Sequence, residues 1–238
     1  MQLAISEIQN HLNFKSQLRS KIQAAIQNRP EESYFSKLDS NIKKNTAFVR
    51  KLKNYTEAQK ESILKDINSL NLTKYISEVA NGIVEAKLKM TDIASIIQVC
   101  VTLHEKYSDF SSQLLEAWQK VLSLKKDEKV LTERSGVHVQ MHQVNLFLQF
   151  NFSKTDCQVS NMSKMRVDVR FYADLISCGV LTPKEGLPLL GSFLTNLINS
   201  DKEEHINATI ILAFCKFCGE DYAGLVSRYT FKKSLGEP

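Results

Sequence analysis

The sequence predicts an all-α protein in which antiparallel helix pairs stack side by side as an α-solenoid. Only four prolines and eight glycines occur in 238 residues, which favours long uninterrupted elements. Apolar residues recur at helical spacing through most of the chain. Helix pairs begin near residues 33, 72 and 109, and this repeat of about 37–39 residues is close to the ~40–47 of HEAT and armadillo arrays. Tetratricopeptide arrays stack in a similar way, but their consensus is absent.

The first expected helix is amphipathic and basic. From Tyr34 onward, Leu38, Ile42, Val49 and Leu52 share one arc of a helical wheel, with Phe48 at its edge. The opposite arc carries the candidate contacts for RNA or for a partner protein, which are Lys43, Lys44, Arg50, Lys51 and Lys53.

Two more helices should follow at once. Thr56-Glu57-Ala58-Gln59 has the pattern of a capping box and predicts a helix start, with an apolar stripe continuing to Leu70. The third helix should begin near Leu72 and end at Lys87 and Lys89, since cations suit a helix C-terminus.

Five further helices are expected. The clearest start is Thr182-Pro183-Lys184-Glu185, which offers an N-cap threonine, a proline at the first helical position and a glutamate at the third. The starts lie near Thr91, Ser108, Lys164, Thr182 and Lys202, and the last three helices should end near Cys178, Asn199 and Cys218, before Gly179 and Gly219 in the first and third cases.

Residues 130–161 interrupt the helical pattern. Apolar residues alternate with polar ones around Leu146–Phe152, and we expect a poorly ordered loop, either a genuine insertion or translated non-coding sequence. The expected organisation is therefore a helical lead-in (1–32), a first part of the repeat domain (33–129), this insertion (130–161), a continuation (162–226) and a tail (227–238).

Charge is concentrated at the beginning of the chain. Residues 1–54 hold ten Lys/Arg against four Asp/Glu, a net charge of +6, whereas the remaining residues have a net charge of −1. This distribution favours contact with RNA or with an acidic protein surface, and a merely solvated helix face remains the alternative. No apolar run is long enough for a membrane helix and no secretory signal is visible, so a soluble intracellular protein is expected.

Catalytic and metal chemistry find little support. The five cysteines are scattered and fit buried free thiols, and Cys215-x-x-Cys218 lacks a second ligand pair for zinc. His138-x-x-x-His142 lies in the interruption without an HExxH glutamate, and we expect His104 on a helix surface. Phosphate-binding loops and nucleophile elbows are absent. We expect no enzyme activity, no cofactor and no metal.

Five residues near the interruption should instead be structural. Asp168 lies two positions from Arg166 and cannot face it on a helix, so pairing with neighbouring repeats is favoured. Large aromatic residues on the flanking helices should pack in the core. The structural candidates are Trp118, Arg166, Asp168, Arg170 and Phe171.

Four segments of the chain carry a resemblance to a known family. They are Ser40–Leu88, Lys164–Phe171 (KMRVDVRF), Thr182–Leu187 (TPKEGL) and Phe214–Val226 (FCKFCGEDYAGLV). They resemble the first of three repeated domains in scaffolds of nonsense-mediated mRNA decay, within the family named for the middle domain of initiation factor 4G. In that family a short loop would replace residues 130–161, and further helices would follow Val226.

The resemblance implies a HEAT-like fold and a non-catalytic scaffold or docking function in nonsense-mediated decay. It implies protein partners, namely the decay helicase, its kinase and an exon-junction-bound factor, largely through other parts of a longer protein, in a cytoplasmic or perinuclear location. No small-molecule substrate or membrane is implied. Two alternatives stay open: a direct RNA-binding repeat module, and a translation-initiation or cap-binding scaffold of the same family.

Overall fold

The computed structural model describes residues 2–122, 162–201, 205 and 207–223, so the expected loop at 130–161 lies outside the described residues. Within this part, helices dominate and no strand occurs beyond a bridge between Asp39 and Leu70, which confirms the all-α prediction. The helices are α1 (Gln2–Gln27), α2 (Glu32–Phe35), α3 (Ile42–Lys53), α4 (Lys60–Ser69), α5 (Ile76–Val84), α6 (Ile93–Lys106), α7 (Phe110–Leu122), α8 (Met162–Ser177), α9 (Pro183–Ser200) and α10 (Ala208–Ala223).

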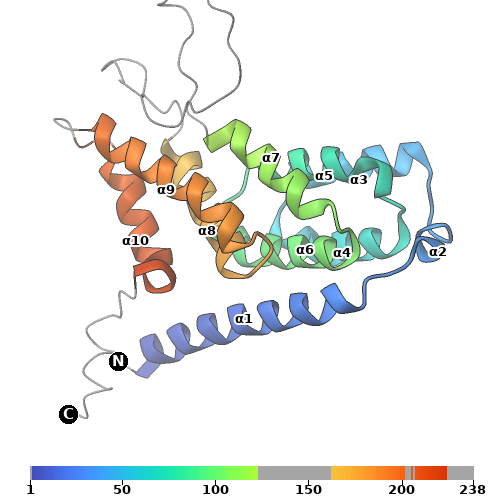
Figure 1. The fold of residues 1–238 in the computed structure, drawn as a ribbon, viewed down its shortest axis with the longest axis horizontal. Helices are drawn as coiled ribbons and strands as arrows, with labels where there is room; N and C mark the ends of the chain where they lie inside the picture. Colours follow the sequence, from blue (N-terminus) through green and yellow to red (C-terminus); the bar gives the residue numbers. More distant parts are fainter. Residues whose placement is uncertain (1, 123–161, 202–204, 206, 224–238) are drawn as a thin grey trace, which may run out of the picture.

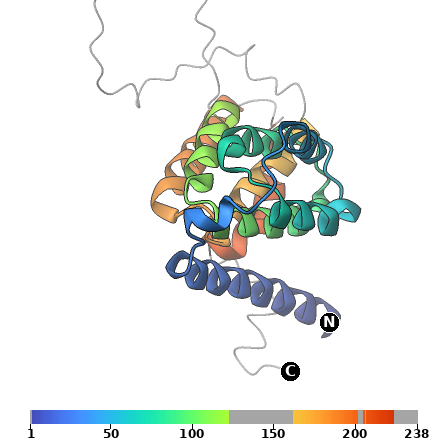
Figure 2. The same ribbon diagram turned by 90° about the vertical axis from the view of Figure 1, so that its right-hand side faces the viewer.

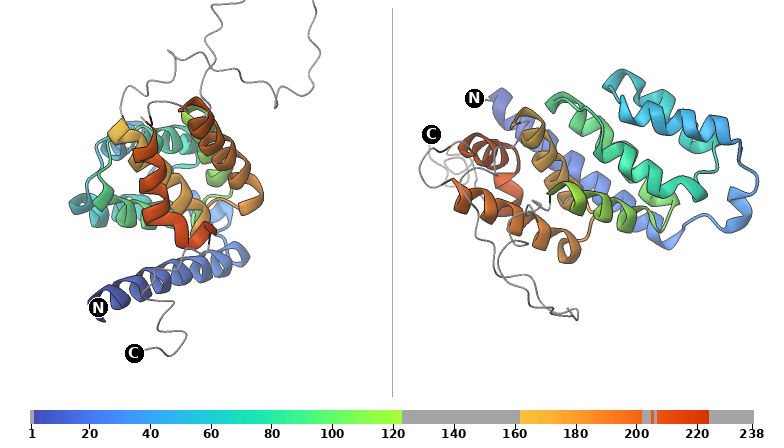
Figure 3. Two further views of the ribbon diagram at one scale, coloured as in Figure 1. Left: turned by 90° about the vertical axis from the view of Figure 1, so that its left-hand side faces the viewer. Right: turned by 90° about the horizontal axis from the view of Figure 1, so that it is seen from above.

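The helices after α2 form two layers. In one layer α3 packs against α5, α5 against α7, and α7 against α9; in the other, α4 packs against α6, α6 against α8, and α8 against α10 (Figure 1 and Figure 3). Each successive pair thus adds one helix to each layer. This arrangement is the predicted solenoid, in which neighbouring pairs bury the apolar faces that no pair could bury alone.

The core between the layers is continuous and rich in aromatic side chains. Trp118 of α7 is fully buried and makes edge-on ring contacts with Phe171 and Tyr172 of α8, at centroid distances of 5.6 and 5.5 Å. Trp118 and Phe171 therefore join the two helices that flank the undescribed segment. Neither ring has a free face for a ligand.

Helix α1 crosses the outside of the second layer (Figure 1 and Figure 2). Its buried stripe consists of Lys15, Leu18 and Ile22, at spacings of three and four residues. The ammonium of Lys15 lies between Asp174 of α8, at 2.7 Å, and Asp221 of α10. One long helix thus connects several repeats.

Basic side chains of α1 and of the residues just after it also reach the C-terminal ends of second-layer helices. Arg19 donates to the Ser177 carbonyl at the end of α8, and Arg29 donates to the His104 carbonyl in the last turn of α6, each at 3.2 Å. These carbonyls have no partner within their own helix and carry its partial negative charge. Guanidinium groups are therefore well placed there.

The predicted helix from Tyr34 is wrong in its first half. The chain forms the short α2 and an irregular link, and α3 begins only after Asn41, whose side chain accepts hydrogen bonds from the Lys43 and Lys44 amides. Residues before Asn41 therefore do not share one helical wheel with those after it. As a consequence Phe48 is central to the buried stripe, whereas Ile42 is 70% exposed.

The capping box at Thr56 was also predicted wrongly. The Thr56 side chain makes no capping hydrogen bond, and a 3-10 turn, Glu57–Gln59, precedes α4. The orphan Glu57 amide instead donates to the Asp92 carboxylate at 3.3 Å. Asp92 also accepts from the Lys89 amide at 2.8 Å, so a residue of the next repeat replaces the local cap.

The predicted connection between α8 and α9 is confirmed. Gly179 ends α8 with φ +87°, a conformation that favours glycine, and Thr182 caps α9 by accepting from the Glu185 amide. Gly186 then allows close approach to α8, because an added Cβ would lie 2.6 Å from Ile176 Cγ1.

The boundaries expected for the last helix are wrong at both ends. α10 begins at Ala208 rather than near Lys202, and it continues through Gly219 to Ala223. Packing outweighs the intrinsic cost of a mid-helix glycine, ~1 kcal/mol. Cys218 is fully buried, and the Tyr222 hydroxyl donates to the Ala173 carbonyl of α8 at 2.6 Å, which holds the last turn in place.

Candidate functional site

Three of the five cations predicted as contacts on α3 are paired within the chain. Lys44 lies 2.6 Å from Asp39, Lys51 lies 2.7 Å from Asp66, and Lys53 lies 2.7 Å from Glu85. Lys51 also donates to Ser62. The first pair holds the link before α3, and the other two tie α3 to α4 and to the end of α5, so the charge of these three lysines is compensated within the chain.

Lys43 and Arg50 are the remaining members of the predicted set. Both are exposed, and among the described residues neither has an acidic partner within 4 Å. They are seven positions apart, which places them about two turns apart on the same side of α3. A surface of two cations is weaker than the five-residue surface that the sequence suggested.

The predicted structural residues on α8 divide into different environments. Asp168 is buried and pairs with Lys164, at 2.6 Å, rather than with Arg166. Burial raises the pKa of the Asp168 carboxyl, and the nearby Lys164 ammonium opposes that shift. Arg166, by contrast, is half-buried and, among the described residues, donates to Ser163 at 3.3 Å.

Arg170 connects three elements. Its guanidinium donates to the Met90 carbonyl at 3.3 Å, lies 4.2 Å from the Phe217 ring centroid of α10, and is 3.6 Å from the Asp174 carboxylate. It therefore bridges the α5–α6 link, α8 and α10. Met90 and Phe217, which Arg170 contacts, line a groove that the sequence did not suggest.

We call this groove the basic groove. It has a volume of about 1020 Å³ and lies between the α5–α6 link, the first turns of α8 and one face of α10. The only carboxylate among its described lining residues is Glu85, which Lys53 neutralises at 2.7 Å. Its cations are Lys87, Lys89, Lys164, Arg166 and Lys216.

The floor of the basic groove is apolar. On α10, Thr209, Leu212, Ala213, Lys216 and Phe217 follow one another at helical spacing and face the groove together. Leu212 is 67% exposed, which is unusual for a leucine on a helix that otherwise packs against α8. Leu88, Met90 and Val167 complete the apolar lining.

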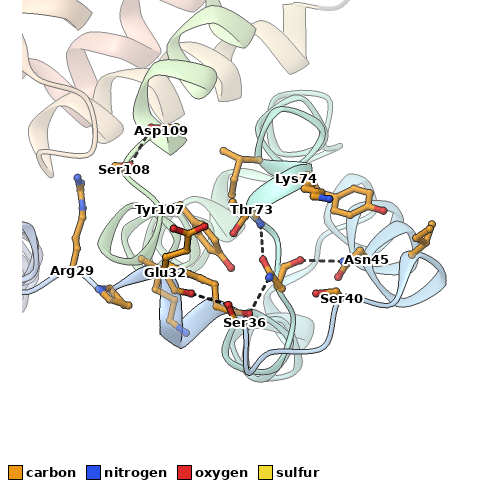
Figure 4. A pocket seen from close by; sticks show the side chains of 17 residues that line it. Arg29, Glu32, Ser36, Ser40, Asn45, Thr73, Lys74, Tyr107, Ser108 and Asp109 are labelled. Atoms are coloured by element: carbon orange, nitrogen blue, oxygen red, sulfur yellow. Dashed lines mark hydrogen bonds between the residues drawn. The ribbon is translucent and has the colours of Figure 1, made fainter.

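A second, polar pocket of about 930 Å³ lies at the opposite end of the repeats (Figure 4). Asn45 donates to the Asn71 carbonyl at 3.1 Å, and the Thr73 amide donates to the Asn71 side chain at 3.2 Å. The Lys106 ammonium also lines it but is held by Tyr34, Ile67 and Asn68. Its polar groups are therefore occupied by contacts that shape the first repeats.

His104, Cys178 and Cys218 are in unreactive environments. His104 is buried, not on the surface as expected, and burial together with Arg29 lowers its pKa to about 4. Burial raises the pKa of the Cys178 and Cys218 thiols to about 12, so both are protonated at neutral pH. In the described residues no cluster of His, Cys, Asp or Glu has the arrangement of a metal site. His138 and His142 lie outside them.

None of the helices that the structure describes is both long and apolar enough to cross a lipid bilayer.

The basic groove was missed because its walls come from three distant segments. Lys87 and Lys89 were interpreted as the end of a helix, but α5 ends at Val84 and both residues lie in the following link. The stripe on α10 was the one signal in the sequence that could have indicated the groove, because its residues recur at helical spacing and therefore share one face of the helix. Which helix faces that stripe could not be deduced from it.

Comparison with known proteins gives consistent results. The chain is 42% identical to human regulator of nonsense transcripts 2 over 216 residues, which cover 91% of this chain and 15% of that protein. It is 40% identical to the Arabidopsis thaliana regulator of nonsense transcripts UPF2 over 116 residues, covering 45% of this chain and 10% of the relative. The chain thus spans about 15% of the length of the human relative.

A solved structure supports the same relationship. The first MIF4G domain of the human nonsense-mediated decay factor UPF2 matches with a TM-score of 0.77 and 39% identity, covering all of this chain and 70% of that one. The family model for the MIF4G domain matches residues 42–235, which include α3 through α10. This chain therefore belongs to the MIF4G domain family.

Proposed function

We propose that this chain is a non-catalytic docking module of the nonsense-mediated mRNA decay machinery. The observation that carries the proposal is its 42% identity, over 91% of its length, to a protein named as a regulator of nonsense transcripts. The two-layer stack of helix pairs suits this role, because such stacks offer long surfaces to other proteins. We further propose that it acts in the cytoplasm, where mRNAs are translated.

A non-enzymatic role is supported by the state of the reactive side chains. The lowered pKa of His104 keeps its imidazole neutral at pH 7, but the group is buried and so cannot reach a substrate. The raised pKa values of the buried thiols of Cys178, just after α8, and Cys218, in α10, remove both groups as nucleophiles. Both observations favour docking of protein components of the decay complex over catalysis as the role of this chain.

Direct RNA binding through α3 is less well supported. Three of its five cations are neutralised by Asp39, Asp66 and Glu85, so the number of phosphates that this helix could neutralise is small. A role in cap binding or initiation has no observation in its favour among the relatives compared, which are named as decay regulators.

The test is depletion of the protein in its own cells by RNA interference, with a reporter mRNA that carries a premature stop codon. We expect the half-life of this mRNA to lengthen and to return to normal when a resistant wild-type copy is expressed. A reporter without the premature stop is the control and should not respond. An unchanged half-life of the premature-stop reporter after depletion would refute the proposal.

A further inference from the structure

We propose that the basic groove binds an acidic, amphipathic segment of a partner protein, whose apolar side chains enter between α8 and α10 while its carboxylates face the surrounding cations. This inference rests on the proposed docking function and assigns that function to one surface. Lys87, Lys89 and Lys216 have no acidic partner among the described residues.

The charge of the groove is not cancelled by its own carboxylates. Glu85 is held by Lys53 at 2.7 Å, and Asp168, which pairs with Lys164, is buried beneath the surface. Arg170 is directed inward to Asp174, at 3.6 Å, and to the Met90 carbonyl. The outward-facing cations therefore create a positive potential that an acidic segment would neutralise.

The floor of the groove supplies apolar contacts besides the charges. Leu212 is 67% exposed beside Phe217, and Met90 and Val167 lie across from them. An exposed apolar surface that lies in a concave site and is rimmed by polar or charged residues is typical of an interaction site. A partner with apolar side chains at helical or alternate spacing would cover this floor.

The same floor distinguishes a peptide from RNA. Base stacking needs an open aromatic face, but Arg170 lies 4.2 Å from the Phe217 ring centroid and Lys216 lies 5.4 Å from it. Phe217 is the only aromatic residue among the described residues that line the groove, so no other side chain there offers a stacking platform. An acidic peptide can use both the cations and the aliphatic floor, whereas a single-stranded RNA would use only the cations.

Fluorescence anisotropy with the whole chain tests the proposal. The probe is a labelled 15-residue peptide of Glu, Asp, Leu and Phe, compared with a Glu/Ser peptide, a Lys/Leu peptide and a 12-nucleotide oligouridine. We expect saturable binding of the first probe, weakened by added salt because screening reduces attraction between exposed charges. The Glu/Ser peptide should bind at least about fivefold more weakly, which corresponds to ~1 kcal/mol for the lost apolar contacts.

Matched variants locate the site. The double variant K87E/K89E should weaken binding about tenfold or more, whereas K43E/R50E, which reverses two exposed cations on α3, should change it less than about twofold. Leu212→Ser should weaken binding about fivefold, and Ile42→Ser, which alters an equally exposed apolar residue at 70%, should not. All four changes are at exposed side chains, so melting temperatures should match the wild type.

Three results would overturn the inference. One is the absence of saturable binding of the acidic amphipathic peptide. Another is an equal loss in K87E/K89E and K43E/R50E, which would indicate unspecific attraction. The third is tighter binding of oligouridine than of the peptide, lost in K87E/K89E, which would make the groove an RNA site. If any of these results is obtained while the reporter still responds to depletion, the groove is refuted as the binding site but the docking function in decay stands. If the reporter does not respond while the peptide binds the groove specifically, the function in decay is refuted but the binding site stands.

Discussion

On α1 and just after it, basic side chains contact acids or helix ends of the same chain, whereas Lys87, Lys89 and Lys216 of the basic groove have no acidic partner among the described residues. Lys15 lies between Asp174 and Asp221, and Arg19 and Arg29 bond to carbonyls at the ends of α8 and α6. Lys87 and Lys216 carry the same charged group as Lys15 and differ from it only in their surroundings. The comparison teaches that composition cannot separate structural cations from those available to a partner.

The two groups of cations also differ in burial, and burial determines how much each cation contributes to the stability of the fold. The Lys15 side chain is 3% exposed, and although burial acts to lower its pKa, the carboxylates of Asp174 and Asp221 raise it overall. A buried cation held in this way stabilises the fold through its partners, and its loss leaves two acids facing each other. Exposed groove cations contribute little to stability.

The largest expected effect lies in the core that both regions share. Trp118→Ala or Phe171→Ala should lower the free energy of unfolding by about 3–5 kcal/mol, because each removes a fully buried ring that bridges α7 and α8. Urea unfolding followed by circular dichroism measures this change. A loss below about 1 kcal/mol would show that the rings do not support the stack.

The next effect separates the two classes of lysine. Lys15→Met should lower the free energy of unfolding by about 3 kcal/mol, because it leaves Asp174 and Asp221 together without their buried cation. Lys87→Met makes the same chemical change at an exposed site and should stay within about 0.5 kcal/mol of the wild type. Equal losses in the two variants would erase the distinction.

The free energy of unfolding should also depend on pH through His104 of α6. His104 is buried against Arg29, and its folded pKa of about 4 lies below the unfolded value, about 6.5. The stability due to neutral His104 is fully present above pH ~6.5 and is lost as the pH falls toward 4, where the unfolded chain binds the proton first.

His104→Leu should therefore reduce the loss of unfolding free energy between pH 7 and 4.5 by about 2–3 kcal/mol relative to the wild type. His205→Asn, which changes an exposed histidine, is the control and should follow the wild type. Asp168 changes stability in the opposite direction, since its pKa is raised, but it is present in both proteins and cancels in the comparison. An identical pH dependence in His104→Leu and wild type would contradict the assignment.

The smallest expected effect is on the groove side. Lys216→Glu and Lys89→Glu should each leave the free energy of unfolding within about 0.5 kcal/mol of the wild type, because neither cation has an acidic partner among the described residues. Thermal unfolding of each variant and of the wild type at two salt concentrations measures this difference in stability. A drop of more than about 1 kcal/mol would mean that these side chains support the fold.

The fold was largely predictable because helix starts and stops are local chemistry. Thr182 and Gly179 have the roles that their residue types suggested. The errors occur where tertiary contacts replace local ones: Asp92 of the next repeat caps the turn before α4 in place of Thr56, and Tyr222 holds α10 past Gly219. Local pattern carries no information about such partners.

The candidate site was predictable only in part. The sequence identified the cations of α3 but could not show that Asp39, Asp66 and Glu85 approach three of them. The sequence identified Arg166 and Arg170 as structural candidates. It did not show that α10 packs against α8 and that a groove lies between these two helices. Both facts depend on which helix faces which, and this is set by the stacking of whole repeats.

The most direct measurement of the central claim is rescue of the premature-stop reporter in depleted cells by charge-reversed variants at equal abundance. The account predicts that K87E/K89E fails to restore the short half-life, whereas K43E/R50E restores it as the wild type does. Both variants should melt like the wild type, so a difference reports the surface and not the fold. Full rescue by K87E/K89E would contradict the account.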